Sequence, residues 1–234
     1  MELIYWRHPT LPGIKVEEVS GGESLPEKVW LDMARQVYCE NGVDAYREIG
    51  HFHSGAPFLY GYAGRISISH TEGLFAVATL PATPEVELGV FSERAALGID
   101  VERADREQVV KILDRFMAEE EKPLVDSSDV ELCVRAWTSK EAVYKAMLSP
   151  GLDFRRDIRI IRMPRPAPVV PVFDPKEFNL PDQSDSWRSL LGEAQVSLPD
   201  GTNQSFLLFS YRSDDFVVTL AYAARCAKFG KSGL

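Results

Sequence analysis

In this 234-residue chain, the types and the spacing of Asp100 and Glu102 indicate residues that could take part in a reaction. They lie two residues apart in segment 97–102, where apolar residues alternate with Gly98 and the two acids. A period of two predicts a strand whose apolar residues face a core and whose carboxylates share the other face. Two acids would therefore occupy one small volume.

Segment 137–145 supplies a third acid and an amine. It is rich in Ala, Lys and Glu, and it contains no Gly or Pro, which predicts a helix. The four-residue spacing of Trp137, Glu141 and Lys145 places these side chains on one side of that helix. If that side faces the strand, three carboxylates and an amine converge.

Three carboxylates are hard oxygen ligands that suit Mg²⁺, which keeps part of its octahedral shell for water and substrate phosphates. This chemistry favours a phosphoryl-transfer site. The alternative is that Glu141 and Lys145 are an ordinary surface pair, worth about 0.2–0.5 kcal/mol on a solvated helix. An Asp-x-Glu at a strand end is also common on protein surfaces, so the spacing alone leaves both interpretations open.

Four segments resemble, in order, the signature of the 4′-phosphopantetheinyl transferases. The pair Gly98–Glu102 and Trp137–Lys145 resembles the central signature of the family. Residues 55–59 resemble its Gly-Lys-Pro segment, and residues 66–71 resemble its Ile-Ser-His-Ser segment. The length, and the region after Pro150, resemble the larger, two-lobed Sfp-type group.

The resemblance implies an α+β fold that is a pseudo-dimer of two similar lobes, with the active site at the lobe interface. We assign residues 1–104 to the N-terminal lobe and residues 105–234 to the C-terminal lobe. A short internal echo between residues 73–79 and 215–221 agrees with such a duplication.

The reaction that the resemblance implies moves the phosphopantetheine arm of coenzyme A to a serine of an apo acyl or peptidyl carrier protein. It depends on Mg²⁺ and releases adenosine 3′,5′-bisphosphate. Asp100, Glu102 and Glu141 would hold the metal ion. Glu141, or a bound water, would accept the serine proton, and Lys145 would stabilise or protonate the departing phosphate. Catalysis would thus depend on Asp100, Glu141 and Lys145.

The resemblance also implies a set of residues that bind coenzyme A. These are Ser69, His70, Lys140, Lys145, Arg35 and Lys28. The chain departs from the family at Ala56, where the family commonly has Lys, so one phosphate contact is missing or supplied from elsewhere. A capping His and solvated basic residues on a helix are the ordinary alternatives for these side chains.

Two other functions fit the same residues. One is a catalytically impaired module that binds coenzyme A or a carrier protein, and Ala56 is the residue that suggests it. The other is a Mg²⁺-dependent hydrolase of diphosphates, which would need no acceptor protein.

Composition limits the class of protein. The net charge of −9 argues against a general nucleic-acid binder, and the 45% hydrophobic content is that of a globular protein. Three cysteines, far apart and without metal-ligand spacing, argue against a disulfide framework.

Because no signal peptide and no membrane-spanning run is evident, we expect a cytoplasmic protein without a membrane partner. A monomer is expected, since a two-lobed chain needs no partner to complete its site.

Further elements are expected around the site. Residues 106–122 predict one helix with the acids 119–121 on its surface, and Ser127 or Ser128 is expected to cap the helix that carries Glu141. Residues 194–198, 205–211 and 216–224 predict an antiparallel meander. Five arginines between 155 and 165 suggest either a docking surface for an acidic carrier protein or a charged edge strand.

Overall fold

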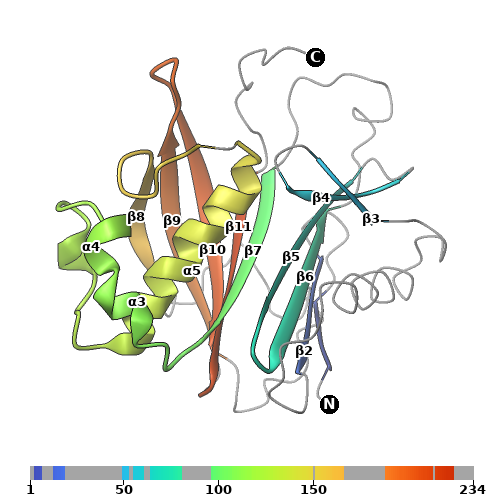
Figure 1. Ribbon diagram of the computed structural model, residues 1–234, viewed down its shortest axis with the longest axis horizontal. Coiled ribbons are helices and arrows are strands. Elements are labelled where there is room, and N and C mark those ends of the chain that lie inside the picture. The colour runs from blue at the N-terminus through green and yellow to red at the C-terminus, as the bar shows by residue number, and fades with distance from the viewer. Residues whose placement is uncertain are drawn as a thin grey trace, which may run out of the picture.

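Five antiparallel strands between residues 96 and 223 form a sheet (Figure 1). Their order is β7-β11-β10-β9-β8. The strands are β7 (Ala96–Arg103), β8 (Ile158–Arg165), β9 (Arg188–Ser197), β10 (Asn203–Arg212) and β11 (Phe216–Ala223). The consecutive pairing of β9, β10 and β11 confirms the predicted meander.

The structure is a computed structural model that describes residues 3–6, 13–18, 49–52, 55–60, 64–80, 96–149, 151–165, 188–212 and 214–223. Lys28 and Arg35, which are predicted to bind coenzyme A, lie outside these ranges, so their predicted role stays a prediction.

A second sheet has the order β1-β2-β6-β5. Its strands are β1 (Leu3–Trp6), β2 (Gly13–Glu18), β5 (Arg65–Thr71) and β6 (Leu74–Leu80). One core, which includes Leu74 and Ala76 of β6, packs against Leu97, Ile99 and Val101 of β7. The apolar face of β7 is therefore buried between the two sheets, as the alternation predicted.

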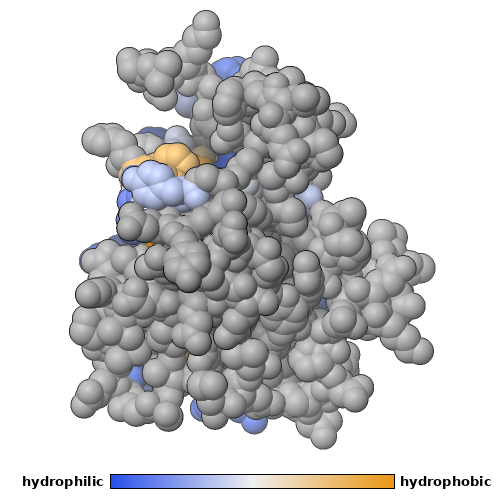
Figure 2. Space-filling model, turned by 90° about the vertical axis from the view of Figure 1, so that its right-hand side faces the viewer, coloured by the Kyte–Doolittle hydropathy of each residue, from blue (hydrophilic) through white to orange (hydrophobic). Residues whose placement is uncertain are grey.

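A short hairpin of β3 (Ile49–His51) and β4 (Pro57–Leu59) stands beside this second sheet. The rings of Phe52, Phe58 and Tyr60 contact one another, with centroids 4.6 and 5.0 Å apart. Phe52 and Tyr60 are about half exposed. Figure 2, which looks onto the side where the hairpin lies, shows one small hydrophobic area among the described residues.

Helix α5 (Val130–Met147) covers the other face of the five-stranded sheet, so the described layers are helix, sheet and sheet. Its N-cap is Asp129, whose side chain accepts a hydrogen bond from the Leu132 N–H at 3.0 Å. The prediction that Ser127 or Ser128 caps the helix is wrong, because Ser128 is engaged in a turn with Asp126. Among the described helices, none has the length and apolar character needed to cross a bilayer.

The predicted single helix over residues 106–122 is also wrong. The chain forms α3 (Gln108–Lys111) and α4 (Leu113–Phe116), followed by the 3₁₀ turn η1 (Lys122–Leu124). The break lies at Ile112, whose backbone leaves the helical region at φ −107° and ψ 6°. Apolar periodicity predicted the buried face but could not locate this break.

The α+β class is confirmed, while the pseudo-dimer of similar lobes stays a prediction. Strand β7, which the expected boundary after residue 104 assigns to the N-terminal lobe, pairs with β11 in the C-terminal sheet. The five-stranded sheet therefore begins at Ala96, and the expected division into residues 1–104 and 105–234 stays a prediction.

Gly98 of β7 lies against the backbone of α5. A Cβ atom at this position would overlap the Ala142 carbonyl oxygen and lie 2.5 Å from the Ala146 nitrogen. Both obstacles are backbone atoms, which cannot move without shifting the helix. Only glycine allows the strand and the helix to approach this closely.

We expect Gly98→Ala to reduce the free energy of unfolding by about 3 kcal/mol or more, because the added methyl group forces α5 away from β7. Chemical denaturation followed by circular dichroism measures the change. Ser205→Ala, on an exposed position of β10, is the control and should change stability by less than about 0.5 kcal/mol. A Gly98→Ala protein as stable as this control would contradict the packing argument.

Candidate active site

The close approach of β7 and α5 brings Asp100 and Lys145 together. The Lys145 Nζ atom lies 2.7 Å from Asp100 Oδ1. Asp100 is buried, whereas the Lys145 side chain is 30% exposed. The predicted convergence of the strand acid and the helix amine is thus observed, and one member of the pair remains accessible to a ligand.

Ser69 of β5 joins the same group. Its hydroxyl donates to Asp100 Oδ1 at 2.8 Å and accepts from Lys145 Nζ at 2.9 Å. Ser69 is 7% exposed. The sequence predicted Ser69 as a coenzyme A contact, but the structure places it among the chain's own polar groups.

Glu102 is held by two neighbours. Arg106 donates to Oε1, and Thr71 of β5 donates to Oε2 at 3.3 Å. Arg106 is only four residues away and nearly half exposed. Its pairing with Glu102 was not predicted, because Glu102 ends a strand and Arg106 follows a turn, where the four-residue spacing of helices does not apply.

Glu141 of α5 lies near the charges of Asp100, Lys145 and Arg106. Burial and, to a smaller extent, the negative charge of Asp100 raise the pKa of Glu141, while Lys145 and Arg106 oppose the shift, and the resulting pKa is about 7. A carboxyl group with this pKa exchanges its proton near neutral pH, which is the range useful for general acid–base chemistry.

The three acids do not form a ready metal cage: the described residues contain no group of three or more His, Cys, Asp or Glu side chains that could hold an ion as they stand. However, Asp100 Oδ2 is buried and has no hydrogen-bond partner. A carboxylate oxygen without a hydrogen-bond partner, close to a second carboxyl group whose pKa is raised, indicates negative charge that the protein does not balance. A hard cation would balance this charge. The donor set therefore fits Mg²⁺, and the three-acid metal site stays a prediction.

A cavity of about 230 Å³ opens beside this group. It lies between residues 55–57, strand β5 and the end of α5, where Tyr144, Lys145 and Leu148 line it. Ala56, at the position where the resemblance expects Lys, is part of this lining. Lys145 thus both contacts Asp100 and lines the cavity.

His70 follows Ser69 on β5 and is exposed. Burial of part of its ring lowers the pKa of His70, and the positive charge of Lys145 lowers it further. A phosphate nearby would favour the protonated ring instead. The predicted phosphate contact of His70 is compatible with this position, and it stays a prediction.

Lys140 lies elsewhere, so the structure does not support its predicted role in binding the diphosphate. Its ammonium group is completely buried and donates to Glu121 at 2.6 Å and to the carbonyl oxygens of Phe154 and Ile158. All three of its donors are used. Adjacent residues on a helix project about 100° apart, so Lys140 and Glu141 cannot share one face.

Glu121 is the partner that the sequence analysis missed. Unlike exposed Glu119 and Glu120, it is 1% exposed, so its assignment to the surface was wrong. Its carboxylate also accepts from the backbone N–H groups of Ala118 and Ile160. The ion pair thereby ties the segment after α4 to α5 and β8, on the side of the helix away from the cavity.

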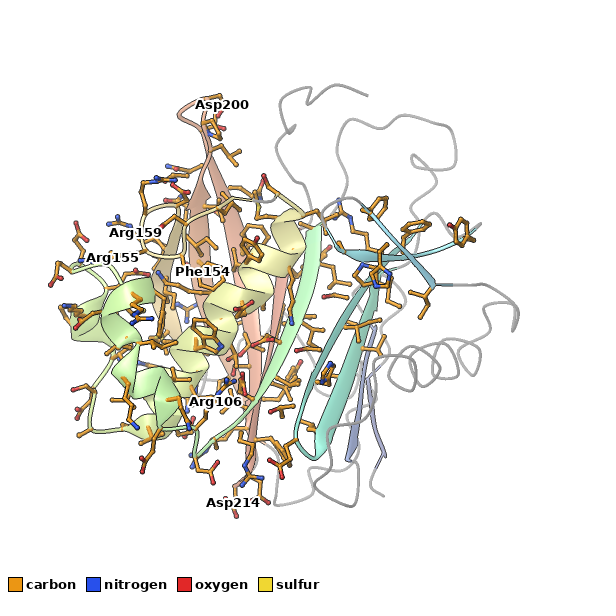
Figure 3. All side chains as sticks on the ribbon, viewed as in Figure 1. Arg106, Phe154, Arg155, Arg159, Asp200 and Asp214 are labelled. Atoms are coloured by element: carbon orange, nitrogen blue, oxygen red, sulfur yellow. The ribbon has the colours of Figure 1, made fainter. Side chains whose placement is uncertain are left out.

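The arginines near β8 are largely neutralised by the chain itself. Arg155 pairs with Glu119, Arg159 with Glu120, and Arg162 with Glu193. Figure 3 shows Arg155 and Arg159 on the side of α5 where α4 lies. These pairs favour a charged, solvated edge strand over a basic docking surface for an acidic protein.

A family model described as "4'-phosphopantetheinyl transferase superfamily" matches residues 96–217, just over half of the chain. The match runs from β7 through α5 to the start of β11. It therefore includes Asp100, Glu102, Glu141 and Lys145. A comparison with curated proteins gives no match.

We expect Lys140→Met to reduce the free energy of unfolding by about 3–5 kcal/mol, because it leaves the buried charge of Glu121 without its partner. Adding Glu121→Gln should recover much of the loss, since the remaining amide carries no charge. Denaturation of the single and double variants measures this coupling. Full additivity of the two changes would show that the pair does not interact.

The pKa of Glu141 makes the stability of the metal-free protein depend on pH. Between the ordinary value of 4.5 and about 7, the folded state binds more protons than the unfolded state, so stability falls as the pH rises through this window. Glu141→Gln removes this loss. Because Glu141 is partly exposed, we expect its advantage over the parent to be only about 1–2 kcal/mol larger at pH 8.5 than at pH 5.

Denaturation at both pH values in the presence of a chelator tests this expectation. Glu119→Gln, which changes an exposed acid, is the control and should show no such dependence. A Glu141→Gln effect that is the same at both pH values would contradict the raised pKa.

Proposed function

The chain belongs to the 4′-phosphopantetheinyl transferase superfamily, and we propose that it transfers the phosphopantetheine arm of coenzyme A to a serine of an apo acyl or peptidyl carrier protein. The product is the holo carrier protein, and adenosine 3′,5′-bisphosphate is released. The observation that carries the proposal is the 2.7 Å contact between Lys145 and Asp100 beside an open cavity.

The transfer forms one bond and breaks one. The oxygen of the acceptor serine attacks the phosphorus that carries the pantetheine arm, and the bond from that phosphorus to the bridging oxygen of the diphosphate breaks. The serine proton must leave during this step. Glu141 is proposed to accept it, since its pKa of about 7 in the metal-free protein is in the range useful for proton exchange. A Mg²⁺ ion held by Glu141 would lower this pKa and make Glu141 a poorer base. A water molecule acting as the base is the alternative.

The departing phosphate accumulates negative charge, which Lys145 would stabilise or protonate. Its ammonium group lines the cavity and is partly exposed. Asp100, Glu102 and Glu141 are the residues that would hold Mg²⁺. When bound, Mg²⁺ would neutralise the diphosphate and so reduce its repulsion of the attacking oxygen. His70 is proposed to contact a phosphate of the bound coenzyme A.

The architecture proposed for this function is the two-lobed Sfp type, active as a monomer. The two sheets support it, because β6 lies next to the edge strand β5 in one sheet and β11 lies next to the edge strand β7 in the other. The two similar segments of the sequence, residues 73–79 and 215–221, fall almost entirely in β6 and β11. The proposed active site would lie where the two edge strands, β5 and β7, contact each other.

The proposal is tested by incubating the protein with coenzyme A, Mg²⁺ and an apo carrier protein, and by following the intact mass of the carrier. We expect the arm to be added, and we expect Asp100→Ala to reduce the rate at least about 1000-fold while the fold remains intact. Asp105→Ala, which changes an exposed acid paired with Arg103, is the matched control and should stay within about twofold of the parent.

Removal of the metal with a chelator should stop the reaction, and added Mg²⁺ should restore it. Binding of coenzyme A without any transfer to a range of apo carrier proteins would favour the impaired binding module that Ala56 suggests. Release of adenosine 3′,5′-bisphosphate without an acceptor would favour a hydrolase. Near-parental turnover by Asp100→Ala would contradict the proposed site.

A further inference from the structure

Arg106 lies between the end of strand β7 and the start of α3 (Figure 3). Its guanidinium group donates to Oε1 of Glu102, near the end of the strand. It also lies close to Glu141: burial raises the pKa of Glu141, and the positive charge of Arg106 is one of the two that oppose this rise. One arginine therefore lies beside two of the three acids that are proposed to hold Mg²⁺.

Asp100 and Glu102 differ in the oxygens that they leave open. Asp100 Oδ2 has no hydrogen-bond partner, whereas each oxygen of Glu102 has one. The partner of Glu102 Oε2 is the neutral hydroxyl of Thr71, at 3.3 Å. The partner of Oε1 carries a full positive charge, which repels a divalent cation bound to the same carboxylate. A metal ion could share Glu102 with Thr71, but it would compete with Arg106.

The exposure of the two side chains indicates which of them can move. The side chain of Arg106 is 46% exposed, whereas that of Glu102 is 11% exposed. The carboxylate is thus held within the site, and the guanidinium group reaches it from the solvent. Because water can replace the partner of an exposed charge, such an ion pair is weak. Displacing Arg106 therefore costs little, but this cost is subtracted from the affinity of Glu102 for a metal ion.

We propose that Arg106 is the internal counter-ion of the metal site, which balances the charge of Glu102 until Mg²⁺ displaces it. The inference rests on the proposed function, because it takes the three acids as the ligands of the metal. Arg106 then sets the affinity of the site for Mg²⁺ and has no part in the transfer step. The acids can share one small volume in the metal-free protein because this cation is present.

The test compares Arg106→Gln with the parent by titrating the metal-free proteins with Mg²⁺ in a calorimeter, without coenzyme A. We expect the variant to bind Mg²⁺ about fivefold more tightly, which is the upper range for the loss of one competing exposed ion pair. Arg106→Lys keeps the positive charge and should stay within about twofold of the parent.

Arg103→Gln is the matched control. It removes the same charge three residues earlier, but Arg103 pairs with Asp105, which is not among the proposed ligands. We expect this control to change the affinity for Mg²⁺ less than twofold. An Arg103→Gln protein that binds Mg²⁺ as tightly as Arg106→Gln would show an effect of net charge alone, and it would overturn the inference.

The stability of the same variants gives a second measurement. In the presence of a chelator, Arg106→Gln should unfold at a lower denaturant concentration than the parent, because Glu102 has lost its counter-ion. Mg²⁺ should stabilise the variant more than the parent, since a ligand that binds more tightly stabilises the folded state more. The gap between the two midpoints should therefore become smaller when Mg²⁺ is added.

Two results separate this inference from the proposed function. If the parent and Arg106→Gln bind Mg²⁺ with equal affinity, or if the gap between their midpoints is the same with and without Mg²⁺, the role of Arg106 is overturned and the metal site stands. If neither protein binds Mg²⁺ by either measurement, the metal site of the proposed function is overturned, and this inference with it.

Discussion

The close contact between β7 and α5 is the constraint on which the site depends. Gly98 has no side chain, so the strand backbone lies directly against the helix backbone at Ala142 and Ala146. Two residues further along β7, and three residues further along α5 from Ala142, lie the partners Asp100 and Lys145. With any larger residue at position 98, the two elements would separate, and their side chains could not form a short ion pair.

Helix α5 carries two lysines that have different roles. Lys140 is entirely buried, and its three hydrogen bonds attach α5 to the segment after α4 and to β8. Lys145 lies more than one turn later, partly exposed, with one side toward Asp100 and one toward the cavity. The first ion pair fixes the helix, and the second holds a charge in a place where a ligand can reach it. A buried pair costs desolvation, which its saturated hydrogen bonds offset.

The sequence predicted the parts of the site that follow from periodicity. Alternation along β7 placed Asp100 and Glu102 on one face, and four-residue spacing placed Glu141 and Lys145 together. Periodicity could not reveal that Ser69 would bond to Lys145, because the two are 76 residues apart and meet only through the packing of two sheets. The burial of Glu121 had the same origin, since its partner lies 19 residues away. Local propensity also missed the break at Ile112, which depends on the packing of two short helices against α5.

Strand β7 is an edge of the five-stranded sheet, and hydroxyl groups of β5 accept hydrogen bonds from part of its backbone, which has a consequence for solubility. An uncovered edge strand offers unpaired N–H and C=O groups to any other extended chain, and so invites aggregation. On β7 that template is occupied at Ile99 and Val101 by serines of the same molecule. The opposite edge strand, β8, has an irregular register against β9 and carries three arginines and a proline. Among the residues that the structure describes, neither edge of the sheet therefore offers a long, regular backbone on which a second molecule could add a strand.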